Sequence, residues 1–217
     1  MELQRTLGIS AATLSRQVRD NARILRIGRT RGARYAAYRT VTGLPSRLPM
    51  FRVDDTGETR PAATLHLLAL GQHWLEPATG AGTLYAGLPP VVTDMAPQGF
   101  LGRRFAETHA DLAVPQRLQD WNDDHRLIAT ARRGEDGPGN LILGEESLHR
   151  FLDSNPATIS RQDYPAQARA AAEGGGSSAG GEQPKFTAQV DTRHLIVKFT
   201  AGDASPSDLR WRDLLVC

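Results

Sequence analysis

Cysteine is almost missing from this sequence, and so is any long apolar run. Cys217 is the single cysteine among 217 residues, which excludes an internal disulfide framework. No stretch approaches the roughly 18 consecutive apolar residues that a membrane-spanning helix requires. The N-terminal segment also lacks the charged and then apolar pattern of a secretory signal peptide, so we expect a cytoplasmic protein.

Lysine is the next scarcity. Of the 26 basic residues only Lys185 and Lys198 are lysine, and the other 24 are arginine. An ammonium group is a compact point charge that suits a phosphate oxygen, and the guanidinium fork of arginine does not replace it sterically. Two nearby lysines in so arginine-rich a chain indicate a phosphate site, with chance as the alternative.

What is present is typical of a globular protein. Hydrophobic residues make up 40% of the chain and charged residues 23%, and the length allows one large domain or two small ones. The net charge of +2 is unevenly spread, because residues 1–47 hold ten arginines against two acidic residues. A basic N-terminal segment on an acidic body favours double-stranded DNA as a partner, and a merely solvated basic surface is the alternative.

The basic segment has the pattern of a helix-turn-helix. Residues 2–7 predict a short helix ended by Gly8, and Ser10 is a good N-cap for a second helix through about Ala22. Side chains of the second helix that point away from its apolar stripe are expected to face a DNA groove. The candidate DNA-contacting residues of this helix and its cap are Ser10, Thr13, Arg16, Gln17 and Arg19.

A basic β-hairpin is predicted next, from two strand-like runs at 24–29 and 34–38. Such a hairpin is the wing of a winged helix, and its arginines Arg29, Arg31 and Arg34 would meet phosphates rather than bases. A small helical hairpin with arginine-rich edges is the alternative. A winged domain normally carries another helix before this pair, so the segment is expected to be a partial one.

From Leu48 onward the pattern becomes mixed α/β. Strands are predicted at 51–53, 64–70 and 141–143, with a turn at Asp54–Gly57 between the first two. The predicted helices span residues 99–109, 117–131, 145–153 (with Leu148 and Leu152 facing inward) and 165–173.

A glycine- and serine-rich loop over residues 174–185 carries the clearest chemistry. Glycines let backbone amides approach anionic oxygens, and two strands follow, 186–190 and 195–199, the second bearing Lys198. This order is typical of a kinase N-lobe. A Walker loop is disfavoured because Lys185 follows Pro184 and leads into a strand, and a dinucleotide fingerprint is disfavoured because a helix precedes the glycines. A flexible linker is the remaining alternative.

Residues 178–185, Ser-Ala-Gly-Gly-Glu-Gln-Pro-Lys, resemble the S-x-A/G-G-x-Q-x-K loop of HipA-type serine/threonine kinases, toxins of type II toxin–antitoxin systems. The resemblance includes 94–103 (DMAPQGFLGR), Asp120-Trp121 and 139–144 (GNLILG), and covers essentially the whole chain. The preceding winged helix is similar to the YjjJ-type branch, in which DNA-binding and kinase parts share one chain.

The resemblance implies a role for each matching residue. Ser178 corresponds to the serine whose autophosphorylation inactivates members of the family, and Lys198 to the strand lysine that contacts the phosphates of ATP. ATP with Mg is the implied cofactor of the intact family, and an antitoxin or a second copy is an implied partner. The implied ATP- and phosphate-binding residues are Ser178, Gly180, Gly181, Gln183, Lys185 and Lys198.

The catalytic aspartate and the metal ligands of the family would lie well beyond Lys198, and nineteen residues follow it here. A helix is expected over 207–216, without the glutamate that pairs with the strand lysine. We therefore predict no catalytic residue in this chain. No metal site is predicted either, because the six histidines lack metal-ligand spacing and Asp123-Asp124-His125 fits a helix start better.

The sequence therefore predicts an α/β (α+β) fold in three parts. These are a partial winged helix-turn-helix at 1–47, a HipA-like N-terminal subdomain at 48–160, and a partial kinase N-lobe at 161–217. The predicted function is that of a truncated HipA-type kinase, catalytically incomplete but DNA-binding. The alternative is a stand-alone winged-helix transcriptional regulator whose C-terminal part serves dimerisation or partner docking.

Overall fold

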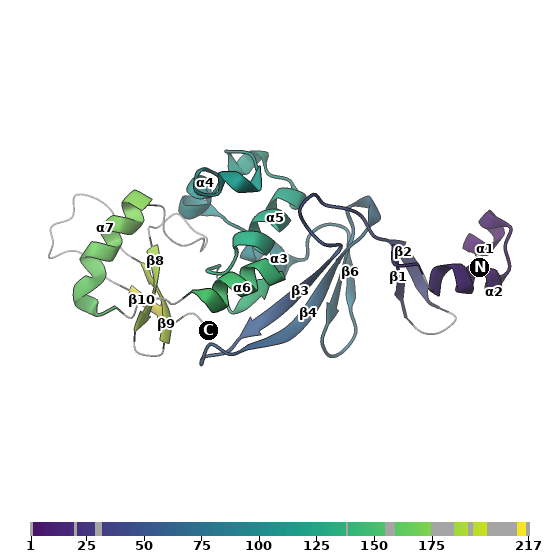
Figure 1. The fold of residues 1–217 in the computed structure, drawn as a ribbon, viewed down its shortest axis with the longest axis horizontal. Coiled ribbons are helices and arrows are strands. Elements are labelled where there is room, and N and C mark those ends of the chain that lie inside the picture. Colours follow the sequence, from purple (N-terminus) through teal and green to yellow (C-terminus); the bar gives the residue numbers. More distant parts are fainter. Residues whose placement is uncertain are drawn as a thin grey trace.

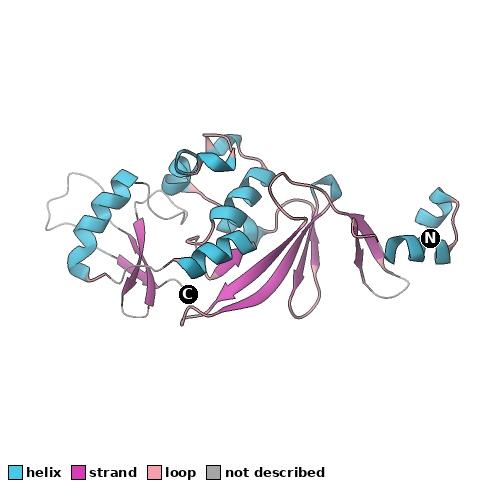
Figure 2. Cartoon of the chain, in the orientation of Figure 1, coloured by secondary structure: helices cyan, strands magenta, loops and turns pink. Residues whose placement is uncertain are grey.

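The structure is a computed structural model. Its fold is mixed α+β, with antiparallel sheets and several helices. The described residues are 2–19, 21–28, 32–137, 139–154, 159–174, 185–190, 193–198 and 212–215. Their strands form three separate groups, and helices lie between and beside them (Figure 2). The N-terminal helices lie at one end of the molecule and the third group of strands lies toward the other (Figure 1).

The N-terminal group consists of α1 (Glu2–Leu7), α2 (Ala11–Arg19) and a hairpin of β1 (Ile24–Ile27) and β2 (Arg34–Ala37). This confirms the predicted order of two helices and a hairpin. The predicted end of the second helix at Ala22 is wrong. The side chain of Asn21 accepts a hydrogen bond from the backbone N–H of Arg23 at 2.9 Å, which favours a turn over another helical turn.

The middle group is a five-stranded antiparallel sheet in the order β6-β5-β4-β3-β7. Its strands are β3 (Arg47–Val53), β4 (Thr59–Leu67), β5 (His73–Pro77), β6 (Thr83–Tyr85) and β7 (Leu141–Leu143).

The strands of this sheet differ from the prediction at both ends, since β3 begins at Arg47 instead of residue 51 and β4 begins at Thr59 instead of residue 64. The predicted turn after β3 is confirmed, because Asp54 Oδ1 accepts from the backbone N–H groups of Thr56 and Glu58, both at 3.0 Å. The prediction that strand continues to Leu70 is wrong, because residues 69–71 form a 3₁₀ turn. Leu70 has a φ of 60° there, which is incompatible with a strand.

Four helices accompany the sheet: α3 (Pro90–Met95), α4 (Gly99–Thr108), α5 (Asp123–Arg133) and α6 (Glu145–Asp153). Helices α3, α5 and α6 lie over one face of the sheet (Figure 1). The main core forms between them, and each buried leucine contributes on the order of 1.5–3 kcal/mol. Its buried members are Val41, Leu48, Met50, Leu65, Leu67, Val92, Met95, Leu127, Ala131 and Leu143.

Helix α5 starts later than predicted. Asn122 forms its N-cap, because the Asn122 side chain accepts from the backbone N–H of His125 at 3.0 Å and the His125 ring accepts from the N–H of Asn122 at 3.2 Å. Trp121 therefore precedes the helix instead of lying within it. It packs in a second apolar cluster, with its ring 5.8 Å from that of Phe105. Asp123-Asp124-His125 forms the first turn of α5, as predicted.

Helix α6 corrects one prediction about packing. Leu152 is 57% exposed and does not face inward, whereas Leu148 is half-buried. The fully buried position is Ser147, whose hydroxyl donates to the Thr130 carbonyl at 3.1 Å and accepts from the Gly134 N–H at 3.0 Å. Because a small polar side chain fits between two close helices, α6 packs on α5 through Ser147 rather than through a leucine.

The C-terminal group comprises α7 (Tyr164–Gly174) and a three-stranded antiparallel sheet in the order β10-β9-β8. Strands β8 (Lys185–Val190) and β9 (Arg193–Lys198) confirm the predicted strand pair. The helix predicted over 207–216 is wrong over the described part, where β10 (Arg212–Leu215) pairs with β9. A short apolar run does not distinguish helix from strand by periodicity, and the free edge of β9 decides it.

Candidate functional site

The candidate DNA-contacting helix, α2, presents part of the predicted set. Ser10 Oγ accepts from the backbone N–H of Thr13 at 3.1 Å and lies 2.9 Å from Thr13 Oγ1, so both side chains are used in the N-cap. Arg16, Gln17 and Arg19 are exposed, and Val18 is buried between them in sequence. The helix therefore offers two guanidinium groups and one amide to a partner.

The hairpin adds further arginines beside this helix in the chain. Arg34 is exposed at the start of β2, in register with Ile27, while Arg29 and Arg31 lie outside the described residues. Arg23 and Arg26 are also exposed and were missing from the candidate set. Arg26 was detectable from the sequence, because it alternates with Leu25 and Ile27 along a strand.

Two polar links tie the end of the hairpin to the middle of the molecule. In the first, the Tyr38 hydroxyl lies 2.8 Å from His66 Nδ1, and His66 Nε2 lies 3.0 Å from a Glu76 carboxylate oxygen. The guanidinium of Arg47 lies 5.8 Å from the centre of the Tyr38 ring. Burial lowers the pKa of His66 below its usual value, although Glu76 opposes this shift, and burial raises the pKa of Tyr38.

The second link is centred on Arg39, two residues after β2. Its Nη1 lies 2.6 Å from Asp124 of α5, and its Nη2 lies 3.2 Å from His73 Nε2. His73 Nδ1 donates to the Gly87 carbonyl at 2.8 Å, which leaves Nε2 to accept from Arg39. Burial lowers the pKa of His73, with the carbonyl of Gly87 opposing the shift, so the neutral ring is the form that fits here.

The two lysines share one row of the C-terminal sheet. Lys185 on β8 is directly opposite Lys198 on β9, and Lys198 is directly opposite Arg212 on β10. Ser178, Gly180, Gly181 and Gln183 lie outside the described residues, so their placement relative to this row stays a prediction.

Within the described ranges, no group of three or more His, Cys, Asp or Glu side chains is arranged to hold a metal ion. No helix in the described parts of the chain is long and apolar enough to cross a membrane.

Comparison with known proteins gives two matches. A family model for the middle domain of YjjJ-like toxins matches residues 44–152. Toxin YjjJ of Escherichia coli (strain K12) is 36% identical over 228 aligned positions, which cover 99% of this chain and 51% of that protein. The chain thus spans about half the length of the curated relative it matches. No solved structure matched.

Proposed function

Because the chain belongs to the YjjJ-like toxin family, we propose that it is the DNA-binding and ATP-lobe portion of a HipA-type serine/threonine kinase. In this proposal the row Lys185, Lys198 and Arg212 binds the phosphates of Mg·ATP, together with Ser178, Gly180, Gly181 and Gln183. The 217 residues bind nucleotide without transferring its terminal phosphate. Autophosphorylation at Ser178, and an antitoxin or second copy as partner, belong to the whole protein.

One observation carries this proposal: the register that brings the two lysines together. A cross-strand pair places Cβ atoms within about 4.5–5.5 Å on one face of the sheet. In kinase N-lobes a strand lysine binds the phosphates of the nucleotide, and this register gives two lysines one such position. The arginine-rich composition makes the pairing of both lysines in one row a specific feature.

Nucleotide binding tests the proposal. Isothermal titration of the chain with Mg·ATP should give saturable binding, and Lys198→Ala should weaken it about tenfold or more, since a charge-assisted hydrogen bond contributes roughly 1.5–3 kcal/mol. Arg60→Ala, which removes an equal charge from a side chain 74% exposed on β4, is the matched control and should leave affinity unchanged. Equal affinity in wild type and Lys198→Ala would refute the assignment of Lys198 to phosphate binding. Transfer of the terminal phosphate by the chain would refute the proposal that it only binds nucleotide.

A second function, DNA binding, is favoured by the exposed Arg16 and Arg19 on α2. Replacing both with alanine should weaken binding to duplex DNA and reduce the slope of log K against log salt by roughly two contacts at about 0.9 each. Arg52→Ala with Arg60→Ala is the matched control, because these exposed arginines face each other across β3 and β4 and carry the same total charge. If both double variants lose the same affinity, the binding is diffuse and α2 is not the contact.

A further inference from the structure

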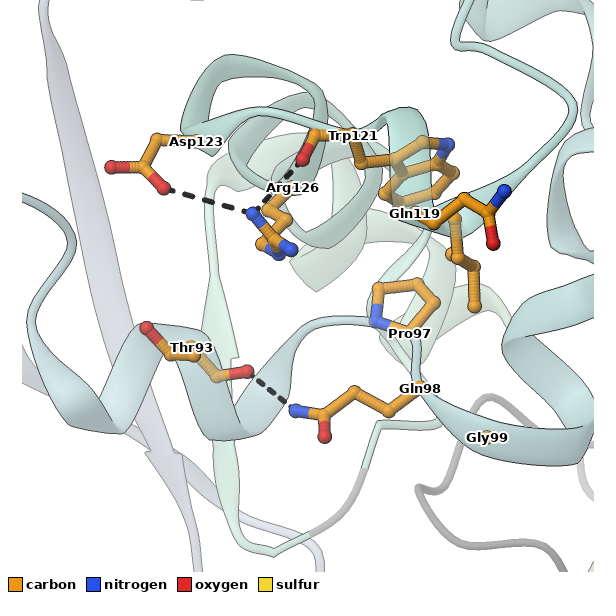
Figure 3. A pocket seen from close by; sticks show the side chains of 9 residues that line it. Thr93, Pro97, Gln98, Gly99, Gln119, Trp121, Asp123 and Arg126 are labelled. Carbon is orange, nitrogen blue, oxygen red and sulfur yellow. Dashed lines mark hydrogen bonds and ion pairs between the residues drawn. The ribbon is translucent and has the colours of Figure 1, made fainter.

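A pocket of about 380 Å³ lies between α5 and the segment that joins α3 to α4 (Figure 3). This volume falls within the range of small-molecule sites. It is formed by the two stretches 93–99 and 118–126, which overlap two of the motifs behind the family resemblance. Neither the proposed DNA-binding helix α2 nor the row Lys185, Lys198 and Arg212 (the phosphate row) contains these motifs. The lining residues are Thr93, Pro97, Gln98, Gly99, Leu118, Gln119, Trp121, Asp123 and Arg126.

Gly102 on α4 fixes how closely the two stretches approach. A Cβ at this position would lie 2.7 Å from Leu118 Cδ1 and 2.9 Å from the carbonyl carbon of Pro97. Both distances are shorter than real side-chain contacts, so only glycine lets α4 pack against both stretches. Glycine is therefore required at position 102 because both neighbours that a side chain would meet, Pro97 and Leu118, line the pocket.

The walls of the pocket are held by hydrogen bonds. Trp121 is 5% exposed, and its indole N–H donates to the Pro115 carbonyl at 2.7 Å. Gln98 Nε2 donates to the Thr93 carbonyl at 2.8 Å, which leaves its Oε1 as an acceptor. One wall is thus a fixed aromatic ring and the opposite side carries a positioned amide.

Arg126 supplies the charge. Its side chain extends from α5 toward the segment that carries Thr93 and Gln98, and it lies beside Pro97 (Figure 3). Nη1 donates to the Trp121 carbonyl at 3.2 Å and lies 3.8 Å from Asp123 Oδ1. These contacts engage Nη1, and the Nε and Nη2 side of the guanidinium offers two parallel N–H donors, the geometry that pairs with carboxylate or phosphate oxygens.

We propose that this pocket binds a small organic molecule through a carboxylate or phosphate group on Arg126. Trp121, Leu118 and Pro97 contact the apolar part of the molecule, and the Gln98 amide accepts a hydrogen bond from it. Asp123 weakens the site, because its carboxylate repels the anion and already shares Arg126. This site is independent of the phosphate row and of α2.

Nuclear magnetic resonance of the isotope-labelled chain tests the proposal with two probes, succinate and inorganic phosphate, against sodium chloride at equal ionic strength. We expect saturable shifts of the Gln98 and Gly99 amides and of the Trp121 indole N–H. Arg126→Ala should weaken binding about tenfold or more, and Arg126→Lys should weaken it less, because the charge remains without the fork. Asp123→Asn should tighten binding.

The matched control is Arg117→Ala, which removes an equal charge from a side chain that is 69% exposed, near the pocket but not lining it. It should bind like the wild type. Shifts with succinate alone assign the site to carboxylates, and shifts with phosphate alone assign it to phosphates. The proposal is overturned if chloride causes the same shifts, if neither probe saturates, or if Arg117→Ala and Arg126→Ala lose affinity equally. Misfolding of a variant lowers affinity. Tighter binding by Asp123→Asn would therefore show that the substitution acts on the binding site itself.

Discussion

Between Arg47 and Asp153 the chain buries a large set of apolar side chains, whereas among residues 5–40 whose side chains are described only Val18 is buried. The middle region is held by a leucine-rich core between a sheet and three helices. The N-terminal segment has two short helices and one hairpin, with arginines exposed along them. In the middle region, the pattern of apolar residues determines a packed core. In the N-terminal segment, the pattern of arginines determines which charged side chains are exposed.

The largest effect should come from the core of the middle region. Leu65 is completely buried in β4, and Leu65→Ala should lower the free energy of unfolding by about 2–5 kcal/mol, through lost burial and the cavity that remains. Leu7→Ala in α1 removes the same atoms from a side chain 55% exposed, and should change it by less than about 0.5 kcal/mol. Denaturant unfolding measures both, and equal losses would abolish the distinction between the two regions.

Arg39 is an exception to the contrast between the two regions. It directly follows the hairpin, but its side chain is fixed by contacts with the middle region. Its side chain is 18% exposed, and Arg39→Ala leaves His73 and Asp124 without this partner. We expect a loss of about 1–3 kcal/mol, near the lower value because Asp124 is 39% exposed. Arg60→Ala, on a side chain 74% exposed, should cost less than about 1 kcal/mol in the same unfolding experiment. A smaller loss for Arg39→Ala than for Arg60→Ala would contradict the link.

Local signals explain which parts of the fold could be predicted from the sequence. Four predicted features depend on residues close together in the chain. They are the helix at 2–7, the N-cap at Ser10, the strand at 141–143 and the strand pair that begins at Lys185. Their spacing, caps and turns are visible in the sequence. The exposed arginines of α2 follow from the same periodicity.

Contacts between distant residues could not be predicted in this way. Tyr38 meets His66 and Arg39 meets Asp124 only because the sheet and α5 bring them together. Similarly, Ser147 takes the inner position of α6 because its hydroxyl has one partner in α5, Thr130, and one at the C-cap of α5, Gly134. A hydrophobic pattern does not represent such hydrogen bonds. The exposure of Leu152 is the consequence.

A smaller effect is expected from the cap of α2. Ser10→Ala removes the oxygen that accepts from the Thr13 N–H and should destabilise this helix by about 1 kcal/mol. Ser10→Asp keeps an acceptor at the cap and is the control. Hydrogen exchange should become faster at α2 amides in Ser10→Ala alone, with unchanged exchange at β4. Faster exchange throughout the chain would mean that the N-terminal segment and the middle region unfold as one unit.

Acidification should give the smallest change, and it acts where the two regions meet. Burial lowers the pKa of both His66 and His73, so the unfolded chain takes up protons near pH 6.5 while the folded chain resists them. Stability is therefore complete above that pH and falls as the pH drops toward the folded pKa values. A second proton on His73 would also face the guanidinium of Arg39. In His73→Gln the fall in denaturation midpoint between pH 7.5 and 5.5 should be smaller than in the wild type, and an unchanged fall would show that His73 does not contribute and that His66 or carboxylates elsewhere cause it.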